Sequence, residues 1–490
     1  MKFGTSGLRG LARDLEGPAA RRYAAAFARH LLRSGMASTG DVILLGRDLR
    51  VSSPEIAGNC ADALARMGFA VADCGAVPTP ALALQGLIRN AASLIVTGSH
   101  IPADRNGIKF YRPDGEINKA DEGAIGALAE TMRVSGEMEG GMRAGVSSAL
   151  VDESSQCLAL FLERNKSLLP ARALAGLKLG VYQHSTVARD LLVEVLAHYG
   201  ADVCPLGRVD SFVAVDTEAV SPETLASLRG WARAHALDAI VSADGDGDRP
   251  LVADETGAPL RGDLLGLVAA QFLKAETVVT PVTSNSGIEA AGDFEVSRTR
   301  VGSPFVIAGM DEAVAAGRSR VMGFEANGGV LTATDFEVNG RTLRALPTRD
   351  SFLPILAVLS LVARQKRPLS HIAAGYRLPA AAADRIENFP SETSAALMAH
   401  LRASDSNLSA FLAPFGQVRS SSNVDGLRLT LADGRIIHLR PSGNAPEMRC
   451  YVEAETEASA EALLQAGLER IRAWADGHGA ASPSGLQERP

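Results

Sequence analysis

Short apolar runs alternate with longer amphipathic stretches through most of the 490-residue chain. The first alternation predicts strands at 42–46, 70–73 and 93–97, with a helix from about 54 to 67. Buried parallel strands read as short apolar runs, and the helices that connect them read as amphipathic stretches. This part of the sequence therefore predicts a parallel α/β sheet.

The same rhythm returns twice further along the chain. Its elements are a strand at 178–182, a helix through 191–198, and strands at 238–242, 277–282, 295–301 and 320–324. After about residue 370 the pattern changes to alternating strands followed by a helix. These later elements are strands at 427–431, 436–440 and 448–454 and a helix over 459–474. We therefore predict three similar α/β domains with mixed sheets and a smaller C-terminal α+β domain.

Changes in composition mark the domain boundaries. A polar, glycine-rich stretch at 135–148 reads as a linker, and the residues from about 477 onward lack periodicity. The predicted domains are 1–148, 149–253, 254–370 and 371–476, followed by a flexible tail at 477–490. Several domains also agree with the length, because one domain usually has roughly 100 to 200 residues.

Composition and charge argue against several classes of protein, namely those that bind nucleic acid and those that bind or span membranes. The chain has 46% hydrophobic and 21% charged residues, which is typical of globular proteins, and its formal net charge is -7. An acidic chain has no general attraction for nucleic acid or anionic membranes, so neither is expected as a partner. No apolar run is long enough to span a bilayer, and no signal-like apolar core follows Met1.

The cysteines favour neither a disulfide framework nor a zinc site. They are odd in number, widely spaced and without a CxxC pair. The five positions are Cys60, Cys74, Cys157, Cys204 and Cys450. Reduced thiols and a cytoplasmic location are therefore expected.

Ser99 lies directly after the apolar run 94–96. In open α/β sheets, ligands gather at the carboxyl ends of the strands. A serine there can become a phosphoryl donor when metal and hydrogen-bond donors hold the phosphate charge. His100 and Lys109 could supply a hydrogen bond and a positive charge. Taken alone, a Ser-His pair after a strand is also an ordinary loop.

Three aspartates at alternate positions, Asp244, Asp246 and Asp248, follow another apolar run. With glycines between them they can face one cation, and their hard oxygens suit Mg²⁺. A calcium loop of the EF-hand type is the main alternative, because Glu255 stands at its twelfth position. We disfavour it, since Arg249 stands where that loop requires glycine and since a strand precedes the segment.

Three further loops carry polar groups that suit an anionic sugar ligand. Glu325 and Asn327 lie two residues apart in a Gly-rich turn, where they could bond neighbouring sugar hydroxyls. Arg440 and Arg449 bracket a loop whose Ser, Gly and Asn could surround one phosphate. Arg9, in the N-terminal Gly-rich loop, is a possible catalytic cation. Each loop alone also reads as an ordinary turn.

Together and in this order, these segments resemble the α-D-phosphohexomutase family. The match spans nearly the whole chain. The segments that carry it are GTSGLRG at 4–10, TGSHIP at 97–102, DGDGDR at 244–249, GFEANGG at 323–329 and RPSGNAPEMR at 440–449. The resemblance implies four domains around a central cleft, with one loop contributed by each.

The resemblance also implies roles for individual residues. Ser99 is similar in position to the phosphoserine of the family, and it joins Asp244, Asp246 and Asp248 as a Mg²⁺ ligand. The catalytic residues expected around Ser99 are Arg9, His100, Lys109 and Arg249. The residues expected to bind the substrate are Gly302, Ser303, Glu325, Asn327, Arg440, Ser442, Gly443, Asn444 and Arg449.

The phosphoserine loop departs from the common family sequence TASHNP. Gly98 and Ile101 replace its Ala and Asn, which changes the support of the loop but keeps Ser, His and Pro. In the sugar-binding loop, where many relatives carry Glu-x-Ser-Gly-His, Asn327 stands for the Ser. We expect the phosphoryl chemistry to survive these changes.

Two histidines that the resemblance leads one to expect are missing. Gly329 stands for the His of Glu-x-Ser-Gly-His, and Ser303 stands for a second one after the third domain's Gly turn. Proton transfer is therefore expected to depend on Lys109, on Arg9 or on the phosphates themselves.

The reaction that the resemblance implies transfers one phosphoryl group twice. Phosphoserine gives its phosphoryl group to a free sugar hydroxyl, which produces a bisphosphorylated sugar. This sugar reverses its orientation in the site, and its other phosphate then returns to the serine. Mg²⁺ and a hexose 1,6-bisphosphate, as activator and intermediate, are the expected cofactors. The site must hold one phosphosugar in two orientations.

The Glu-Ala-Asn-Gly-Gly sequence at 325–329 resembles the bacterial phosphomannomutase branch of the family. Interconversion of mannose 6-phosphate and mannose 1-phosphate, in GDP-mannose biosynthesis, is therefore the expected activity. Dual action on mannose and glucose phosphates is a close alternative. The two sugars differ in the orientation of the C2 hydroxyl, and none of these motifs contains a group that is expected to recognise it. Phosphoglucosamine mutase, a silent sugar-phosphate or calcium-binding protein and a hydrolytic phosphatase are further alternatives. A monomer or small homo-oligomer is expected.

Overall fold

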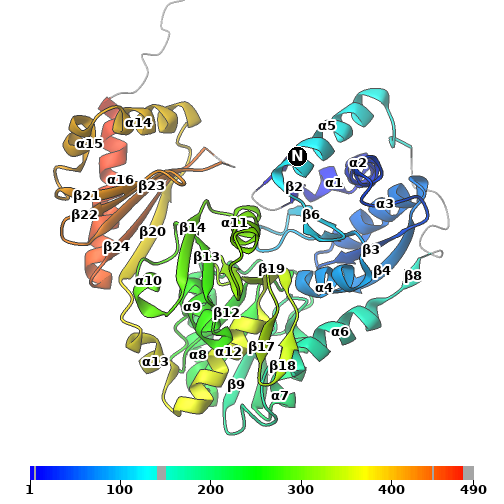
Figure 1. Ribbon diagram of the computed structural model, residues 1–490, viewed down its shortest axis with the longest axis horizontal. Helices are drawn as coiled ribbons and strands as arrows, with labels where there is room; N and C mark the ends of the chain where they lie inside the picture. The colour runs from blue at the N-terminus through cyan, green and yellow to red at the C-terminus, as the bar shows by residue number, and fades with distance from the viewer. Residues whose placement is uncertain (5–6, 141–149, 444–445, 478–490) are drawn as a thin grey trace, which may run out of the picture. The chain divides into compact units, whose positions relative to one another are not determined.

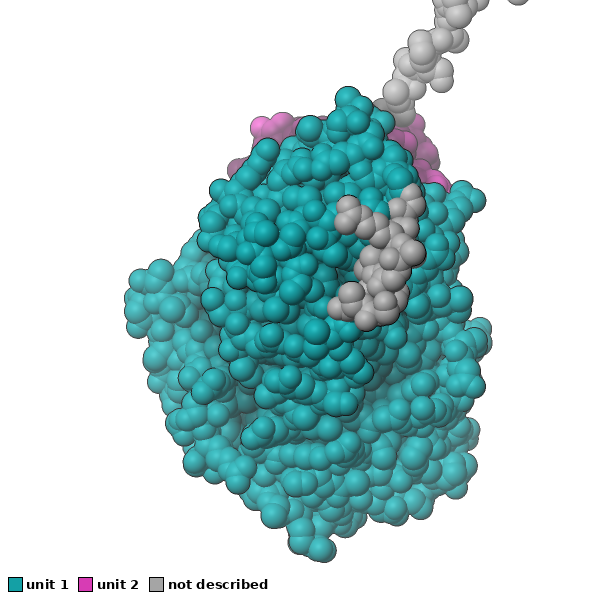
Figure 2. Space-filling view, turned by 90° about the vertical axis from the view of Figure 1, so that its right-hand side faces the viewer, with its two compact units in different colours: residues 1–284, 288–297, 301–377 teal, residues 285–287, 298–300, 378–490 magenta. Residues whose placement is uncertain are grey.

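The computed structural model of the chain describes residues 1–4, 7–140, 150–443 and 446–477. It contains two units, which Figure 2 colours separately. Unit 1 comprises residues 1–284, 288–297 and 301–377, and unit 2 comprises 285–287, 298–300 and 378–490. Three sheets with packed helices carry the described part of the chain before residue 378, together with a two-stranded hairpin, and a fourth sheet follows (Figure 1).

The first sheet has eight strands. In spatial order they are β1 (Lys2–Phe3), β2 (Leu8–Leu11), β6 (Arg105–Arg112), β5 (Ser93–Val96), β3 (Val42–Arg47), β4 (Ala70–Ala76) and β8 (Val151–Asp152), while β7 (Gly115–Glu116) pairs with β6. The helices of this region are α1 (Ala12–Leu15), α2 (Pro18–Ser34), α3 (Ser53–Arg66), α4 (Thr79–Arg89), α5 (Lys119–Ser135) and α6 (Ser154–Lys166). β3 runs parallel to β4 and β5, and β6 runs antiparallel to β5, so the sheet is mixed.

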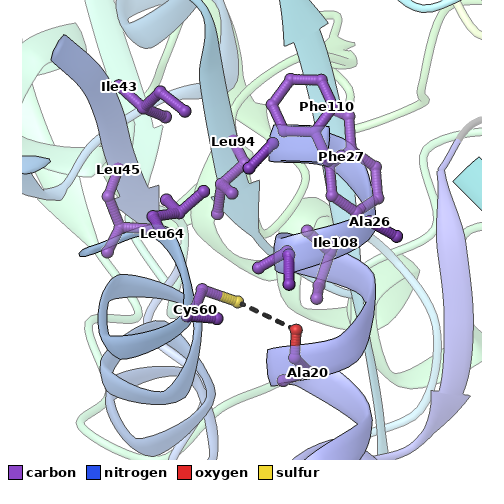
Figure 3. Packing of buried hydrophobic residues seen from close by; sticks show 14 of the residues in the cluster. Ala20, Ala26, Phe27, Ile43, Leu45, Cys60, Leu64, Leu94, Ile108 and Phe110 are labelled. Atoms are coloured by element: carbon purple, nitrogen blue, oxygen red, sulfur yellow. Dashed lines mark hydrogen bonds between the residues drawn. The ribbon is translucent and has the colours of Figure 1, made fainter. Parts of the chain in front are cut away.

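The core of the first region lies between this sheet and the helices α2 and α3 (Figure 3). Phe27 of α2 meets Phe110 of β6 with ring centroids 5.0 Å apart. Leu64 of α3 and Leu94 of β5 are completely buried in the same cluster. Each such side chain contributes about 1.5–3 kcal/mol of burial free energy. This packing fixes the strand β5, whose carboxyl end leads into the loop of Ser99.

The second sheet has four strands and carries the aspartate loop. Its strands are, in spatial order, β10 (Asp202–Leu206), β9 (Lys178–Tyr182), β11 (Ala239–Ala243) and β12 (Pro250–Ala253), and its helices are α7 (Arg189–His198) and α8 (Pro222–His235). β9 and β11 run parallel, whereas β12 returns antiparallel to β11. The turn between β11 and β12 therefore presents residues 244–249 at the carboxyl end of a buried strand.

The third sheet is also mixed. Its strands are, in spatial order, β14 (Glu295–Thr299), β13 (Thr277–Pro281), β15 (Val321–Phe324), β16 (Val330–Thr332) and β19 (Leu346–Asp350). A separate hairpin is formed by β17 (Phe336–Val338) and β18 (Arg341–Leu343). The helices of this region are α9 (Gly262–Leu273), α10 (Ile288–Ala291), α11 (Ser303–Ala315), α12 (Phe352–Gln365) and α13 (Leu369–Gly375). β13 and β15 run parallel, and β16 runs antiparallel to β15 and β19.

The fourth sheet belongs to unit 2 and has its own hydrophobic core. Its five antiparallel strands are, in spatial order, β20 (Ala380–Ile386), β24 (Met448–Ala454), β23 (Ile436–Pro441), β22 (Leu427–Leu431) and β21 (Val418–Ser422). Its helices are α14 (Ser391–Ala403), α15 (Asp405–Leu412) and α16 (Glu457–Gly477). Leu397, Leu429 and Leu468 meet in the core between sheet and helices.

These sheets confirm the predicted fold class of three mixed α/β sheets followed by a smaller α+β region. The strands predicted at 178–182, 427–431 and 448–454 agree with the structure residue by residue. The predicted boundaries between four domains remain a prediction. Most of the predicted linker (residues 141–148) and all but the first residue of the predicted tail lie outside the described residues.

All five cysteines are free, as the sequence predicted. Within the described residues, no helix combines the length and the apolar composition that crossing a bilayer requires.

Candidate active site

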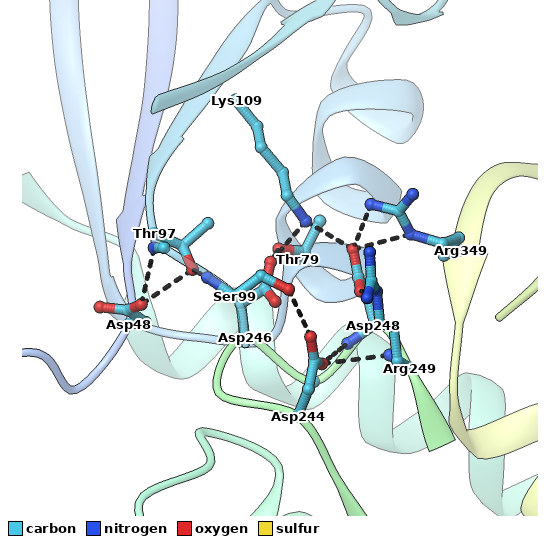
Figure 4. A network of polar contacts seen from close by, with 12 residues as sticks. Asp48, Thr79, Thr97, Ser99, Lys109, Asp244, Asp246, Asp248, Arg249 and Arg349 are labelled. Carbon is cyan, nitrogen blue, oxygen red and sulfur yellow. Dashed lines mark hydrogen bonds and ion pairs between the residues drawn. The ribbon is translucent and has the colours of Figure 1, made fainter. Parts of the chain in front are cut away.

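Two loops meet where β5 and β11 end (Figure 4). The Oγ atom of Ser99, which follows β5, donates a hydrogen bond to Oδ2 of Asp244, which follows β11, at 2.5 Å. Ser99 is buried and has a φ of 54°, in the left-handed region that residues other than glycine seldom adopt. The structure therefore brings the predicted nucleophile and the first predicted metal ligand into direct contact.

Asp48, just beyond the end of β3, supports the backbone that leads into Ser99. It accepts hydrogen bonds from Thr97 Oγ1 at 2.8 Å and from the backbone N–H of Gly98 at 3.2 Å. Thr97 Oγ1 in turn accepts a bond from the N–H of Ser99 at 2.8 Å. Because β3 and β5 are parallel neighbours, their carboxyl ends lie at the same edge of the sheet.

Arg50 holds the other side of the same loop. Its guanidinium donates to four backbone carbonyl groups: those of Ser99 at 3.0 Å, Ile101 at 2.6 Å, Pro102 at 2.7 Å and Arg105 at 2.8 Å. Arg50 is buried, and such a fork of donors fixes several acceptors at once. The loop of Ser99 is therefore held by the Arg50 side chain on one side and by Asp48 on the other.

The three aspartates form a buried cluster that suits a divalent cation. One carboxylate oxygen from each of Asp244, Asp246 and Asp248 lies within 4.8 Å of the others. The Oδ1 atoms of Asp246 and Asp248 are buried without a hydrogen-bond partner, although buried oxygens normally have one. The backbone N–H groups of Asp248 and Arg249 both donate to Asp244 Oδ1 at 3.1 Å. Hard carboxylate oxygens that accept no hydrogen bond fit Mg²⁺.

Two cations from different sheets face this cluster. The Nζ atom of Lys109, on β6, lies 2.5 Å from Asp246 Oδ2 and 2.5 Å from Asp248 Oδ2. Arg349, at the end of β19, donates to Asp248 Oδ2 from Nε at 3.1 Å and from Nη2 at 2.8 Å. Thr79, which begins α4, donates to Asp246 Oδ2 at 2.6 Å.

The charges in the cluster shift its pKa values in opposite directions. Burial, together with the negative charges of Asp246 and Asp248, raises the pKa of Asp244 well above its usual range. Burial opposes ionisation of Asp248 as well, but Arg349 and Lys109 hold the pKa of Asp248 below its usual range. Lys109 and Arg349 pair with carboxylates of this cluster, and Arg249 Nε lies 3.9 Å from Asp248 Oδ1. Nearby positive charge of this kind favours the ionised form of a carboxylate.

His100, Arg9 and Arg249 lie around Ser99. His100 Nδ1 is 3.3 Å from Ser99 Oγ, and its Nε2 is 3.5 Å from Nη1 of Arg249. The positive charge of Arg249, burial and Arg9 lower the pKa of His100 to about 2. Arg9 donates to the carbonyl oxygen of Thr97, and burial lowers the pKa of Arg9 to about 10. All the residues expected at the transferring group therefore come together in unit 1.

Glu325 and Asn327 lie in the turn between β15 and β16. Asn327 Nδ2 is 3.4 Å from Glu325 Oε2, and its Oδ1 accepts a bond from the N–H of Gly329 at 2.9 Å. Arg349 Nη1 donates to the same Glu325 oxygen at 2.7 Å, so this arginine contacts both the expected sugar-binding glutamate and the aspartate cluster. Both Glu325 and Asn327 are buried.

Ser303 and Gly302 lie at the start of α11. Gly302 occupies the position before the helix with a φ of 128°, which favours glycine. Ser303 Oγ donates to Glu116 Oε2 at 3.0 Å, and Thr348 Oγ1 donates to the other carboxylate oxygen at 2.7 Å. The hydroxyl that replaces the expected second histidine is therefore bonded to a buried carboxylate.

The arginine loop belongs to unit 2. Arg440 Nε donates to Asp425 Oδ2 at 2.7 Å, and Arg449 Nη2 donates to Glu447 Oε2 at 3.2 Å. The N–H of Ser442 donates to the carbonyl of Glu447 at 2.9 Å, which closes the base of the loop. Gly443 is exposed at its tip, and Asn444 lies outside the described residues.

Comparison with known proteins identifies the chain's relatives. Models of the phosphoglucomutase/phosphomannomutase alpha/beta/alpha domains I, II and III match residues 1–134, 160–257 and 261–377, and the model of the C-terminal domain matches 388–469. A phosphomannomutase of Sinorhizobium fredii is 56% identical over 470 residues, which cover 95% of this chain and 98% of the relative. The chain belongs to the phosphoglucomutase/phosphomannomutase family.

Further relatives agree with this membership. A phosphomannomutase of Salmonella muenchen is 40% identical over 479 residues, which cover 96% of each chain. A solved structure of a phosphoglucomutase/phosphomannomutase family protein from Burkholderia thailandensis shares the fold, with a TM-score of 0.73 at 21% identity over 98% of this chain and 99% of that one. The predicted family is confirmed, and the chain is an enzyme of the phosphohexomutase type.

The sequence analysis did not assign four residues that contact the loop of Ser99 or the aspartate cluster. They are Asp48, Arg50, Thr79 and Arg349. Asp48 and Arg50 follow a predicted strand directly, so the rule that strands present ligands at their carboxyl ends could have found them. Arg349 stands in the sequence LPTRDSFLP, where a charged pair interrupts an apolar stretch. Such an interruption indicates buried charges that need partners.

Proposed function

We propose that this enzyme interconverts mannose 6-phosphate and mannose 1-phosphate through a phosphorylated Ser99 and a bisphosphorylated sugar. The relatives at 56% and 40% identity are both phosphomannomutases, which supports the mannose substrate. The observation that carries the mechanism is the contact of Ser99 Oγ with the buried aspartate cluster, with Lys109 on its other side. A serine in such a charged, buried setting is built for phosphoryl transfer.

In the proposed reaction, the bond between phosphorus and Ser99 Oγ breaks as a bond from a sugar hydroxyl oxygen to phosphorus forms. The hydroxyl proton leaves to solvent or to a phosphate oxygen. The reverse transfer, from the other phosphate of the intermediate, restores the phosphoserine. Arg9, Lys109 and Arg249 supply positive charge near the transferring group, and Arg50 keeps the loop of Ser99 in place.

Asp244, Asp246 and Asp248 would hold Mg²⁺, with Ser99 as a further ligand. The Oδ1 atoms of Asp246 and Asp248, which are buried and accept no hydrogen bond, support this assignment. Bound Mg²⁺ supplies positive charge that stabilises the transferring phosphoryl group. We also propose that Glu325 and Asn327 bind sugar hydroxyls, with Gly302 and Ser303 beside them as further substrate contacts, and that Arg440, Ser442, Gly443, Asn444 and Arg449 bind the second phosphate.

A hexose 1,6-bisphosphate is the proposed activator, because it can phosphorylate Ser99 and is also the intermediate. The free state of all five thiols supports a reducing, cytoplasmic setting for the reaction. We propose a monomer or a small homo-oligomer as the working form.

Replacing Ser99 tests the proposed function. Ser99→Ala removes the only phosphoryl acceptor of the mechanism, so we expect kcat with mannose 1-phosphate and glucose 1,6-bisphosphate to fall more than about a thousandfold. A coupled assay for mannose 6-phosphate measures this, and intact-mass analysis detects the phosphorylated protein. Ser227→Ala, on α8, is the matched control and keeps wild-type activity. Ser99→Ala with near wild-type turnover would contradict the phosphoserine mechanism.

The same assay separates the substrates. Comparing kcat/KM for mannose 1-phosphate and glucose 1-phosphate measures the difference in transition-state binding. Preference for mannose by more than about tenfold, or about 1.4 kcal/mol, supports a phosphomannomutase, and a smaller ratio supports the dual enzyme. Stoichiometric release of inorganic phosphate would instead indicate a phosphatase.

A further inference from the structure

One buried guanidinium joins the expected sugar-binding loop to the aspartate cluster. Arg349 donates from Nη1 to Glu325 Oε2 at 2.7 Å, and from Nε and Nη2 to Asp248 Oδ2 at 3.1 and 2.8 Å. The two carboxylates follow strands of different sheets, β15 and β11. The guanidinium makes these three contacts from three separate nitrogen atoms in one plane, a geometry that the single nitrogen of an ammonium group does not reproduce.

Arg349 fits because residue 329 has no side chain. A Cβ atom built on Gly329 would lie 2.8 Å from both Cδ and Cγ of Arg349 and 3.0 Å from its Cβ. These distances are shorter than carbon contacts in folded proteins, so any larger residue would displace the arginine. The φ of Gly329 is outside the left-handed region. A glycine is therefore needed here for the room that it leaves, and not for its backbone conformation.

The bridging arginine and the glutamate that it contacts are both shielded from solvent. Arg349 is 2% exposed, and Glu325 is 5% exposed. Burying a guanidinium between two carboxylates is stable only when the geometry of all three groups is fixed. Loss of Arg349 would leave Glu325 with the weaker contact of Asn327 Nδ2 at 3.4 Å. The Asp248 carboxylate would keep Lys109 and the more distant Arg249 as cations.

We propose that Arg349 is a positioning residue of the mutase: it sets the Glu325 carboxylate, the proposed sugar-hydroxyl acceptor, at a fixed separation from the Asp248 carboxylate of the aspartate cluster, and Gly329 is required because it admits this arginine. The inference rests on the proposed function of Glu325. In many relatives position 329 carries the histidine of Glu-x-Ser-Gly-His. In this chain, the space beside Gly329 is occupied by Arg349, which belongs to the strand β19.

A double-mutant cycle tests the coupling of the two positions. We expect Arg349→Gln and Gly329→Ala each to raise the KM for mannose 1-phosphate about tenfold or more, because both release Glu325. The double variant is expected to be no worse than the more damaged single variant. Additive losses in the double variant would overturn the proposal, because they would show that Gly329 does not act through Arg349.

A conservative variant separates positioning from simple stability. Arg349→Lys keeps the charge but has one nitrogen in place of the three that contact Glu325 and Asp248, so we expect it to stay folded, with a KM still raised about tenfold. It also keeps the proposal testable if Arg349→Gln fails to fold. A lowered melting temperature with wild-type KM in Arg349→Lys and Gly329→Ala would mean a purely structural ion pair and would overturn the inference.

Controls and a binding measurement distinguish this inference from the proposed function. Gly123→Ala and Arg133→Gln, both on the exposed side of α5, are the matched controls and keep wild-type kinetics. Calorimetric titration of mannose 6-phosphate reports sugar affinity without turnover, and we expect the same tenfold loss there. If the wild type neither binds nor converts the phosphosugar, the proposed function fails; if it does both and the variants bind equally well, only the inference fails.

Discussion

Arg50 explains why the loop of Ser99 departs from the common family sequence. Its guanidinium binds four carbonyl oxygens of that loop and of the strand that follows. A Cβ atom at Gly98 would lie 2.5 Å from Arg50 Cζ, so this conformation of the arginine and a side chain at 98 exclude each other. The glycine thus follows from how closely the arginine approaches the backbone.

Replacing Arg50 by lysine is expected to loosen this loop. A single ammonium cannot reach four carbonyl groups, and each buried carbonyl left without a donor costs about 1–3 kcal/mol. We predict a kcat at least about tenfold lower and a lowered melting temperature. Arg47→Lys, at the end of the same strand β3, is the matched control because its side chain is half-exposed and pairs with Asp73. Equal kinetics in the two variants would show that Arg50 does not position Ser99.

At the scale of single residues, the sequence predicted the groups that follow strands and stand in known motifs. Ser99 and the aspartates 244–248 were found in this way, and the structure places them together. Arg349 could not be assigned a contact from the sequence, because its partners Asp248 and Glu325 are 101 and 24 residues away. Spacing along the chain predicts neighbours within an element, whereas contacts between sheets depend on tertiary packing.

At the scale of elements, β6 shows where hydrophobic patterning fails. The strand Arg105–Arg112 has buried residues over most of its length, yet three of its eight residues are Arg or Lys and a fourth is Asn. Lys109 is buried there because Asp246 and Asp248 accept its ammonium. Hydrophobic patterning therefore does not predict this strand, since the charged Lys109 faces the buried aspartates and not the solvent.

Strand β23 carries a buried histidine whose titration affects stability. His438 Nε2 lies 2.6 Å from the carbonyl oxygen of Asp425, and burial lowers the pKa of His438 from 6.5 to about 4. Between these pH values the unfolded chain binds the proton and the folded chain does not, so stability falls as the pH falls. The loss reaches at most about 3 kcal/mol.

We predict that His438→Gln flattens this dependence. Glutamine keeps an N–H donor for Asp425 but does not titrate, so its melting temperature should fall less than that of the wild type between pH 6.5 and 4. Thermal unfolding followed by circular dichroism measures the difference. The exposed His371→Gln serves as control and should follow the wild type. Parallel curves for all three proteins would show that His438 does not titrate in this way.

At the scale of the whole molecule, the aspartate cluster links the first and second sheets of unit 1. Ser99 reaches Asp244, Thr79 reaches Asp246, and Lys109 reaches both Asp246 and Asp248. The sequence predicted both sheets and both loops. It also placed Lys109 near Ser99, but it could not show that Thr79 contacts the same junction, because Thr79 stands in none of the motifs.

Mg²⁺ is therefore expected to stabilise this junction as well as to support turnover. A cation that binds only the folded state raises stability by about 2.7 kcal/mol at a hundredfold excess over its Kd. We predict that millimolar Mg²⁺ raises the melting temperature of the wild type and that a chelator abolishes turnover. Asp246→Asn should lose both responses, whereas Asp202→Asn, on the exposed start of β10, should keep them. Activation by Ca²⁺ above that by Mg²⁺ would contradict the metal assignment.

The close approach of Arg349 to Gly329 also constrains the order in which these residues can change. A protein with a side chain at 329 has no room for this arginine conformation, whereas a protein with glycine at 329 can acquire the arginine in a second step. Once the arginine holds both carboxylates, returning a side chain to 329 disrupts the site. Glycine at 329 and this conformation of Arg349 are therefore linked: the glycine has to be present before the arginine can take this conformation, and the arginine has to move before a side chain can return to 329.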